Sequence, residues 1–175
     1  MTNAREIRPA REDDLPAILT IYNEAIEKTT AVFEYRAHTI EMRREWFKAK
    51  QAASLPVLVA AESGARLGFA SYGPFRAWPA YKYSVELSVY VDERVRARGI
   101  GTALVAAVVD HARASGLHVV IAGITADNAV SIRLHEKLGF VEVAHIPEVG
   151  YKFGRWLDLK LFQLVLDGPA HPTEP

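Results

Sequence analysis

A short segment rich in arginine and glycine carries the residues of this chain that most clearly specify chemistry. It reads Arg94-Val95-Arg96-Ala97-Arg98-Gly99-Ile100-Gly101-Thr102 and stands between an alternating apolar stretch and an alanine-rich stretch. Glycines at 99 and 101 keep side chains away from the backbone, and the N–H groups of a first helical turn lack intrahelical acceptors. Such N–H groups, together with arginine charges, attract anions. The segment therefore predicts a pyrophosphate-binding turn, with an arginine-rich surface loop as the alternative.

The residues around this turn exclude two common phosphate loops. A Walker loop needs Gly-Lys-Ser/Thr, but Gly99 is followed by Ile100-Gly101-Thr102, without a lysine. The dinucleotide fingerprint has Gly or Ala three positions after its second glycine, where this chain has Leu104. The segment instead resembles motif A of the GNAT N-acetyltransferases, Gln/Arg-x-x-Gly-x-Gly/Ala, which holds the pyrophosphate of acetyl-coenzyme A. The resemblance implies acetyl-CoA contacts from Arg96, Ala97, Arg98, Gly99, Ile100, Gly101 and Thr102.

The stretch Ser84–Val91 before the turn alternates in polarity like a strand. Val85, Leu87, Val89 and Val91 share one face, and Glu86, Ser88 and Tyr90 share the other. In the GNAT family the corresponding strand splays from its neighbour, and its backbone binds the pantetheine arm and the acetyl carbonyl. The resemblance thus implies cofactor contacts from Leu87, Ser88, Val89, Tyr90 and Val91.

Glu86 is the predicted catalytic base, because it opposes the apolar face of a strand that ends at the cofactor turn. Acetyl transfer to an amine requires a group that takes a proton from the ammonium. A carboxylate with an ordinary pKa of about 4.3 is a weak base for this purpose, so we expect a water relay or a raised pKa. The alternative is a solvated strand residue without a catalytic role.

A second segment, Asn128–Phe140, resembles motif B of the same family. There an asparagine contacts the cofactor and a tyrosine protonates the departing thiolate; here Asn128 and Ser131 are the expected cofactor contacts, and His135 occupies the tyrosine position. A histidine with a pKa near 6.5 is able to protonate a thiolate whose thiol has a pKa of about 8.5. We expect His135 to act as acid, base or substrate-positioning group, with a structural helix histidine as the alternative.

The chain is similar almost end to end to the phosphinothricin and methionine sulfoximine/sulfone acetyltransferase branch. Three segments carry this similarity: Gly73–Val91, Val130–Phe140 and Gly150–Asp158. That branch itself carries a histidine in the motif B helix. The similarity implies direct transfer, in a ternary complex, of an acetyl group to the α-amine of a small amino-acid analogue. It also implies a homodimer and a role in detoxification or herbicide resistance.

Such substrates carry a carboxylate and a tetrahedral polar group, so their pocket needs cationic and hydroxyl donors. The predicted substrate-binding residues are Phe33, Arg76, Tyr81, Tyr83 and Glu86. One alternative is a GNAT enzyme for another amine, such as a protein N-terminus or a polyamine, although Arg76 and Lys82 make this loop basic and disfavour a polyamine. A non-catalytic CoA-binding domain is the third possibility.

Length and composition agree with a single N-acetyltransferase domain over 1–167, followed by a tail at 168–175 that we expect to be disordered. The 175 residues include 21 basic and 21 acidic ones, which argues against a nucleic-acid or anionic-membrane partner held by bulk charge. Cysteine is absent, and the six histidines are scattered, so we expect no metal site. No signal peptide or membrane span is predicted, which favours a cytoplasmic protein.

The expected fold class is α/β, more fully an α+β mixed sheet of the GNAT type. Its N-terminal half should be mostly antiparallel, with a parallel strand–helix–strand unit at the cofactor turn and helices on both faces. Apolar periodicity predicts helices at 15–27, 40–51, 100–113 and 129–138. Asp13 and Asp14 should cap the first helix and Thr39 the second, while Gly116 and Gly139 should end the last two. The expected strands are 6–8, 56–62, 67–72, 84–91, 118–124, 140–149 and 158–166.

Overall fold

The structure is a computed structural model that describes residues 5–174 of the chain. Its contacts divide the chain into two compact units, residues up to Ser71 with Val89–Ala107, and Tyr72–Ser88 with Val108 onward. Strands β3 (Ala65–Pro74) and β4 (Ser84–Val91) and helix α3 (Ile100–Ala114) contribute to both units. The expected single domain over 1–167 stays a prediction, and the two units are described in turn.

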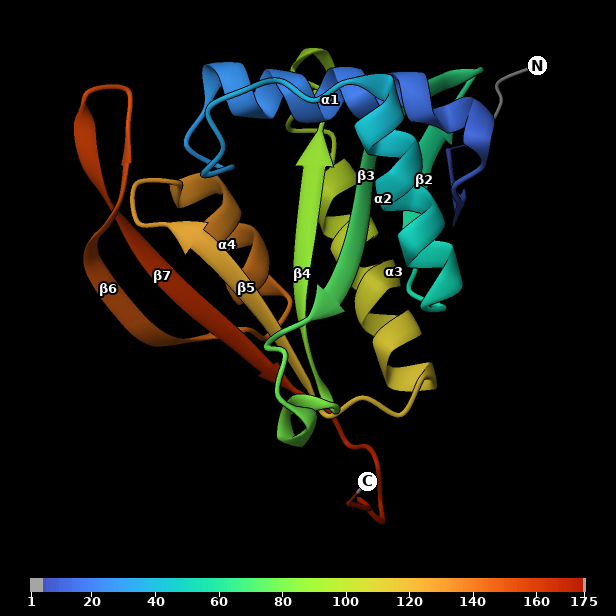
Figure 1. The fold of residues 1–175 in the computed structure, drawn as a ribbon, viewed down its shortest axis with the longest axis vertical. Coiled ribbons are helices and arrows are strands. Elements are labelled where there is room, and N and C mark those ends of the chain that lie inside the picture. Colours follow the sequence, from blue (N-terminus) through green and yellow to red (C-terminus); the bar gives the residue numbers. More distant parts are fainter. Residues whose placement is uncertain (1–4, 175) are drawn as a thin grey trace. The chain divides into compact units, whose positions relative to one another are not determined.

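The first unit contains an antiparallel set of strands with two helices beside it (Figure 1). Strand β1 (Glu6–Pro9) pairs with β2 (Val57–Glu62), which pairs with β3. Helices α1 (Leu15–Lys28) and α2 (Ile40–Ala52) follow β1 in the sequence. Thr39 caps α2 by accepting a hydrogen bond from the Met42 N–H, as predicted. The mostly antiparallel N-terminal half is therefore confirmed.

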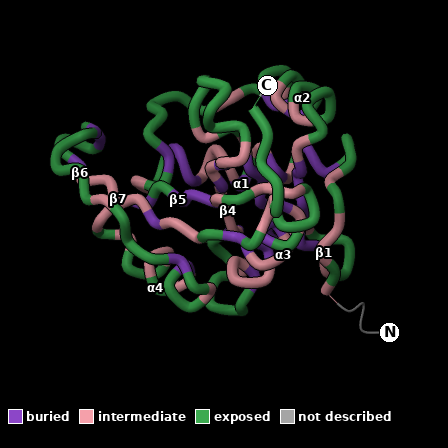
Figure 2. The backbone as a smooth tube through the Cα atoms, turned by 90° about the horizontal axis from the view of Figure 1, so that it is seen from below, coloured by how far each residue is buried: buried purple, intermediate pink, exposed green. Residues whose placement is uncertain are grey.

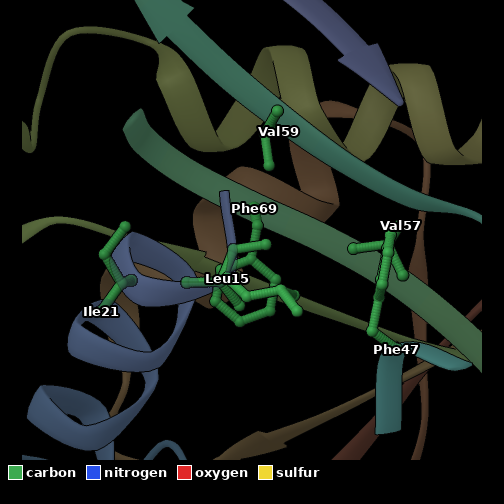
Figure 3. Packing of buried hydrophobic residues seen from close by; sticks show 7 residues of the cluster. Leu15, Ile21, Phe47, Val57, Val59 and Phe69 are labelled. Atoms are coloured by element: carbon green, nitrogen blue, oxygen red, sulfur yellow. The ribbon is translucent and has the colours of Figure 1, made fainter. Parts of the chain in front are cut away.

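Helices pack against both faces of β3 in this unit. Phe69 points into a cluster with residues of α1 and α2, including Leu15 and Phe47 (Figure 3). The adjacent Gly68 faces the other side, where a Cβ would lie 3.1 Å from Leu104 Cδ1 of α3 and 2.7 Å from the Tyr90 backbone oxygen. Successive strand residues point to opposite faces. The prediction of helices on both faces is thus confirmed, and Gly68 permits a close approach that any side chain would block.

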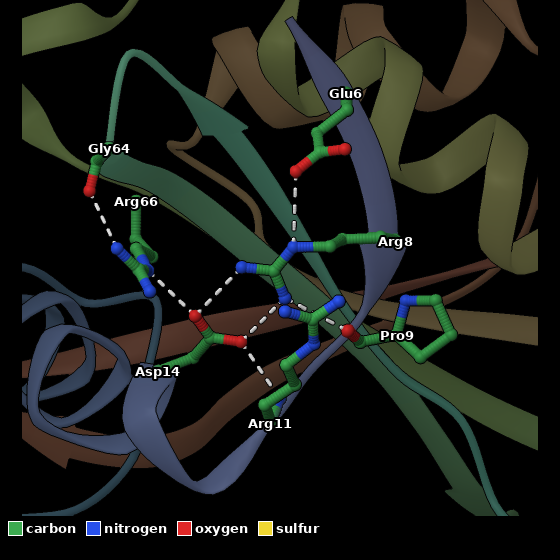
Figure 4. A network of polar contacts seen from close by, with 7 residues as sticks. All are labelled: Glu6, Arg8, Pro9, Arg11, Asp14, Gly64 and Arg66. Atoms are coloured by element: carbon green, nitrogen blue, oxygen red, sulfur yellow. Dashed lines mark hydrogen bonds and ion pairs between the residues drawn. The ribbon is translucent and has the colours of Figure 1, made fainter.

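Asp14 joins three segments of the first unit through one buried carboxylate (Figure 4). Its oxygens accept hydrogen bonds from Arg8 Nη1 at 2.7 Å, Arg66 Nε at 2.6 Å and the Arg11 N–H at 2.8 Å. Burial alone would raise the pKa of Asp14, but these three donors outweigh it and hold the pKa well below its usual value. Asp14 is the N-cap residue of α1, yet its side chain makes no capping hydrogen bond. The predicted cap was wrong because the two guanidinium groups compete for the carboxylate.

The second unit contains one parallel strand pair and a long hairpin. Strand β4 pairs in parallel with β5 (Val119–Thr125) over four residue pairs, from Ser84 opposite Val119 to Leu87 opposite Ala122. β5 pairs antiparallel with β7 (Arg155–Val165), which pairs antiparallel with β6 (Val141–Lys152). Helix α4 (Ala129–Lys137) lies between β5 and β6 in the sequence. The predicted parallel pairing of the two strands that precede and follow the glycine-bearing turn in the sequence is therefore confirmed.

The late hairpin is longer than predicted. Its strands meet at a turn in which Phe153 and Gly154 have φ of 51° and 73°, so 150–152 and 155–157 extend the pairing beyond the expected 140–149 and 158–166. Most of β6 is exposed, as its colour in Figure 2 shows.

Helices α3 and α4 end just before the glycines that were predicted to end them. Gly116 and Gly139 have φ of 70° and 88° just after α3 and α4, the left-handed conformation that favours glycine. Three short 3₁₀ helices, at Glu12–Asp14, Pro79–Tyr81 and Glu93–Val95, had no counterpart among the predicted elements. Within residues 5–174, no helix combines the length and apolar character needed to cross a bilayer.

Candidate active site

The arginine–glycine turn lies in the first unit and leads directly into α3. Ala97 and Gly99 have φ of 63° and 74°, so the chain turns twice through the left-handed region before the helix begins at Ile100. A Cβ added at Gly99 would meet no atom within 4 Å. The N–H groups of the first helical turn, including those of Gly101 and Thr102, have no intrahelical acceptor. This geometry fits the predicted pyrophosphate-binding turn.

The three arginines of the turn differ in their partners. Arg94 binds Asp92, with its Nε 2.9 Å from Oδ1, and Arg98 Nη2 donates to Glu62 Oε2 at 2.6 Å. Among residues 5–174, Arg96 makes no side-chain hydrogen bond or ion pair, and its side chain is exposed. Arg96 is therefore the arginine of the turn whose charge is best placed to serve a bound anion.

The remaining predicted residues of the first unit have mixed surroundings. Val89 and Val91 are half-buried near the end of β4, and the Tyr90 ring packs edge-on against Tyr22 with centroids 5.2 Å apart. Phe33 lies in the segment between α1 and α2 and is 46% exposed.

Glu86 lies in the second unit on β4, between the buried residues Val85 and Leu87. Burial raises the pKa of the Glu86 carboxyl, and the positive charge of Arg76 partly opposes this rise. Within residues 5–174, the Glu86 carboxylate makes no hydrogen bond or ion pair. A half-buried carboxylate with a raised pKa is a better proton acceptor than an ordinary surface glutamate. Ser88, also half-buried, is the first β4 residue beyond the parallel register.

Three predicted substrate residues of the second unit, Arg76, Tyr81 and Tyr83, lie in the loop between β3 and β4. The Phe75 N–H donates to the Ser84 oxygen at 3.2 Å and closes this loop. The Arg76 guanidinium lies 4.3 Å from the centre of the Phe75 ring, which also packs edge-on against Tyr81. The Tyr83 hydroxyl instead accepts a hydrogen bond from the Thr173 N–H at 3.1 Å. Arg76 and Tyr81 thus share one aromatic partner, whereas Tyr83 contacts the C-terminal tail; disorder of that tail stays a prediction.

The α4 residues form one chain of hydrogen bonds. Asn128 Oδ1 caps the helix by accepting the Ser131 N–H at 3.1 Å. His135 is 1% exposed, and its Nδ1 lies 2.8 Å from the Ser131 backbone oxygen. A carbonyl only accepts, so Nδ1 carries the proton and Nε2 is the free acceptor. Within residues 5–174 this buried Nε2 has no partner. Burial lowers the pKa of His135, which is therefore neutral at neutral pH.

Sequence reasoning missed Gly123 of β5, which lies against the predicted base. A Cβ added there would lie 3.0 Å from Glu86 Oε1. The available signal was a lone glycine inside an otherwise apolar strand. The predicted residues divide between the two units: the predicted pyrophosphate-binding turn lies in the first, and Glu86, Arg76 and His135 lie in the second.

Comparison with known proteins identifies a family match over most of the chain. Residues 7–161 match the Acetyltransferase (GNAT) domain family. The L-methionine sulfoximine/L-methionine sulfone acetyltransferase of Salmonella typhimurium is 45% identical over 166 residues, which are 95% of this chain and 97% of the relative. The phosphinothricin N-acetyltransferase of Streptomyces coelicolor is 39% identical, covering 90% and 94%.

Solved structures agree with these matches. YncA of Salmonella typhimurium, determined with its cofactor acetyl-CoA, superposes with a TM-score of 0.94 at 45% identity and covers 98% of this chain and 99% of its own. The ribosomal-protein-alanine N-acetyltransferase of Brucella melitensis has a TM-score of 0.91 at 47% identity, covering 92% and 99%. The predicted mixed α/β fold is confirmed by these neighbours.

Proposed function

Because the chain belongs to the GNAT acetyltransferase family, we propose that it uses acetyl-CoA to acetylate the α-amine of a small amino-acid analogue. The candidates are methionine sulfoximine, methionine sulfone and phosphinothricin, which the relatives' names contain. The observation that carries the proposal is the half-buried Glu86 carboxylate, with its raised pKa, on a strand of a GNAT fold.

The turn at 96–102 fits the diphosphate of acetyl-CoA. Its left-handed residues Ala97 and Gly99 expose backbone at the start of α3. Arg96 adds a positive charge that makes no side-chain hydrogen bond or ion pair within residues 5–174. Helix N-termini and guanidinium groups both favour a diphosphate. When bound, acetyl-CoA supplies an activated acetyl thioester.

Glu86 accepts the proton that the ammonium of the acceptor loses. A raised pKa brings the carboxylate closer to the pKa of the amine, so proton transfer, directly or through one water, costs less than with an ordinary glutamate. Arg76 lies near enough to influence the Glu86 charge, and it is a suitable partner for the carboxylate of an amino-acid substrate.

His135 acts in its neutral form. Its Nδ1 proton is fixed by the Ser131 oxygen, so Nε2 is an acceptor, and burial disfavours a cationic histidine as the acid. We therefore assign it the positioning role among the roles considered for it, because an acceptor orients a donor group without changing charge. Asn128 and Ser131 hold the start of the same helix.

A protein N-terminus remains the alternative acceptor with specific support, since the Brucella melitensis neighbour is named a ribosomal-protein-alanine N-acetyltransferase. Direct transfer in a ternary complex and a homodimer complete the proposal. Exposed apolar side chains on the β6–β7 hairpin, at Tyr151, Phe153 and Trp156, suit a subunit contact. Detoxification, herbicide resistance and a cytoplasmic location stay predictions.

A thiol-release assay tests the proposal. Purified protein with acetyl-CoA is offered methionine sulfoximine, methionine sulfone, phosphinothricin, ordinary amino acids, a peptide with N-terminal alanine and a polyamine. We expect turnover with the amino-acid analogues, and about 10²-fold lower kcat in Glu86→Gln with little change in acetyl-CoA affinity. Glu136→Gln, an exposed change on α4, is the matched control and should keep wild-type turnover.

The same assay separates the alternatives. Preference for the peptide would replace the proposed acceptor, and acetyl-CoA binding without turnover on any amine would indicate a non-catalytic domain. Gly101→Glu places a carboxylate in the anion-binding turn and should abolish acetyl-CoA binding in calorimetry while the fold is kept. Retained affinity would mean that the diphosphate binds elsewhere.

A further inference from the structure

We propose that Gly123 is a positioning residue for acetyl transfer, because its lack of a side chain leaves the space in which the Glu86 carboxylate lies. This inference rests on the proposed function, in which Glu86 accepts the proton of the amine. Gly123 touches no reacting atom and acts only through Glu86.

Two ordinary reasons for a glycine inside a strand do not apply to Gly123. Its φ is not positive, in contrast to five other glycines of the described residues such as Gly116 and Gly139. Its strand contains no bulge, since β5 pairs with β7 without a register shift from Val119 opposite Val165 to Thr125 opposite Leu159. A strand glycine with neither feature indicates the close approach of another group.

The group that approaches is the Glu86 carboxylate. Glu86 stands opposite Ile121 in the parallel pair, so Gly123, two residues further along β5, lies on the same face. A Cβ at Gly123 would lie 3.0 Å from Glu86 Oε1, with Leu159 Cδ1 at 3.6 Å and Leu161 Cδ2 at 3.9 Å. The carboxylate therefore occupies a niche, the space that a side chain at Gly123 would fill, and the two leucine side chains lie beside this space.

A side chain at position 123 would displace the carboxylate and leave the backbone in place. The nearest atom is the end of a flexible side chain, unlike Gly68, where the nearest atom is a backbone oxygen at 2.7 Å. Alanine should shift the carboxylate slightly, and valine should exclude it from the niche. A general base works only within hydrogen-bond reach of its proton, so such a shift lowers turnover.

The test compares Gly123→Ala and Gly123→Val with the wild type, using methionine sulfone and acetyl-CoA. We expect kcat to fall about tenfold in the alanine variant and further in the valine variant, with an unchanged KM for acetyl-CoA. Carboxyl ¹³C NMR titration, with the Glu86 signal assigned through Glu86→Gln, should show a lower Glu86 pKa in Gly123→Val, because the carboxylate moves toward solvent. In a Glu86→Gln background, Gly123→Ala should lower kcat no further.

Val165→Ile, which adds a methylene group at an exposed β7 position, is the control for an added group on this sheet and should keep full kcat. Unchanged kcat and an unchanged or higher Glu86 pKa in Gly123→Val would overturn the inference. Wild-type turnover in Glu86→Gln would instead contradict the role of Glu86 in the proposed function. The NMR titration does not depend on turnover, so it still decides whether Gly123 positions the carboxylate.

Discussion

His135 Nδ1 lies 2.8 Å from the Ser131 backbone oxygen, and this hydrogen bond fixes the tautomer of a fully buried imidazole. Burial lowers the pKa of His135. We therefore expect His135 to stay neutral, with the proton on Nδ1, from pH 9 down to about its ordinary pKa near 6.5. Long-range ¹H–¹⁵N NMR of the imidazole measures this directly. A protonated Nε2 at pH 7, or titration above pH 6.5, would contradict the assignment.

The different partners of Arg94 and Arg96 predict unequal effects on cofactor binding. Arg96→Ala should weaken acetyl-CoA binding about tenfold, on the scale of one charge-assisted contact. Arg94→Ala should weaken it less, because the Arg94 guanidinium is already held by Asp92. Isothermal titration calorimetry at two salt concentrations measures both, and the Arg96 effect should shrink at high salt. Equal losses in the two variants would show that the ion pair opens when the cofactor binds.

Removing the Asp14 carboxylate should destabilise the first unit strongly. Asp14→Asn leaves two guanidinium groups without their buried partner, which we expect to cost about 3 kcal/mol in the free energy of unfolding. Asp110→Asn, which breaks the exposed i,i+3 pair with Arg113, is the control and should change little. Urea denaturation followed by circular dichroism measures both.

The pH dependence of this effect has a definite sign. The pKa of Asp14 is depressed in the folded state, so its contribution is fully present above the unfolded value of about 4 and is lost as the pH falls below it. The difference between wild type and Asp14→Asn should therefore be largest near neutral pH and shrink below pH 4. A constant difference across this range would argue against an ionised, paired carboxylate.

Gly68 and Gly123 should respond differently to the same substitution. Gly68→Ala brings a methyl group to 2.7 Å from the Tyr90 backbone oxygen, and overpacking of this kind costs about 1–3 kcal/mol. The methyl group of Gly123→Ala would lie close only to the flexible end of the Glu86 side chain, with two leucine side chains at ordinary contact distances, so this variant should keep its stability. Thermal unfolding measures the loss of stability in each variant. Equal losses in the two variants would contradict this prediction.

Local signals were sufficient for most of the fold. Thr39, Gly116 and Gly139 act at helix ends through contacts with nearby backbone, so their roles are readable from short sequence windows. The end of the late hairpin was not readable in this way. Gly150 resembles a strand terminator, but cross-strand pairing such as Tyr151 opposite Trp156 carries the strands past it.

The candidate site likewise has features that local sequence predicts and features that it does not. The glycine turn and the alternation around Glu86 were sufficient to predict candidate site residues, because both patterns depend on residues close together in the sequence. The partial burial of Glu86, the pairing of Arg94 and Arg98 with carboxylates and the niche over Gly123 depend on residues brought together by folding. No single window of the sequence contains them.

The shared carboxylate of Asp14 also constrains how the sequence is able to vary. Arg66 lies 52 positions away from Asp14 in the chain, yet the guanidinium groups of Arg8 and Arg66 both bind that one buried carboxylate. A change at Arg8 or Arg66 alone removes a hydrogen-bond donor from the buried carboxylate, and a change at Asp14 alone removes the partner that both guanidinium groups share. A joint replacement by apolar residues leaves no such unpaired group. In an alignment of relatives, these three positions should therefore be retained or replaced together.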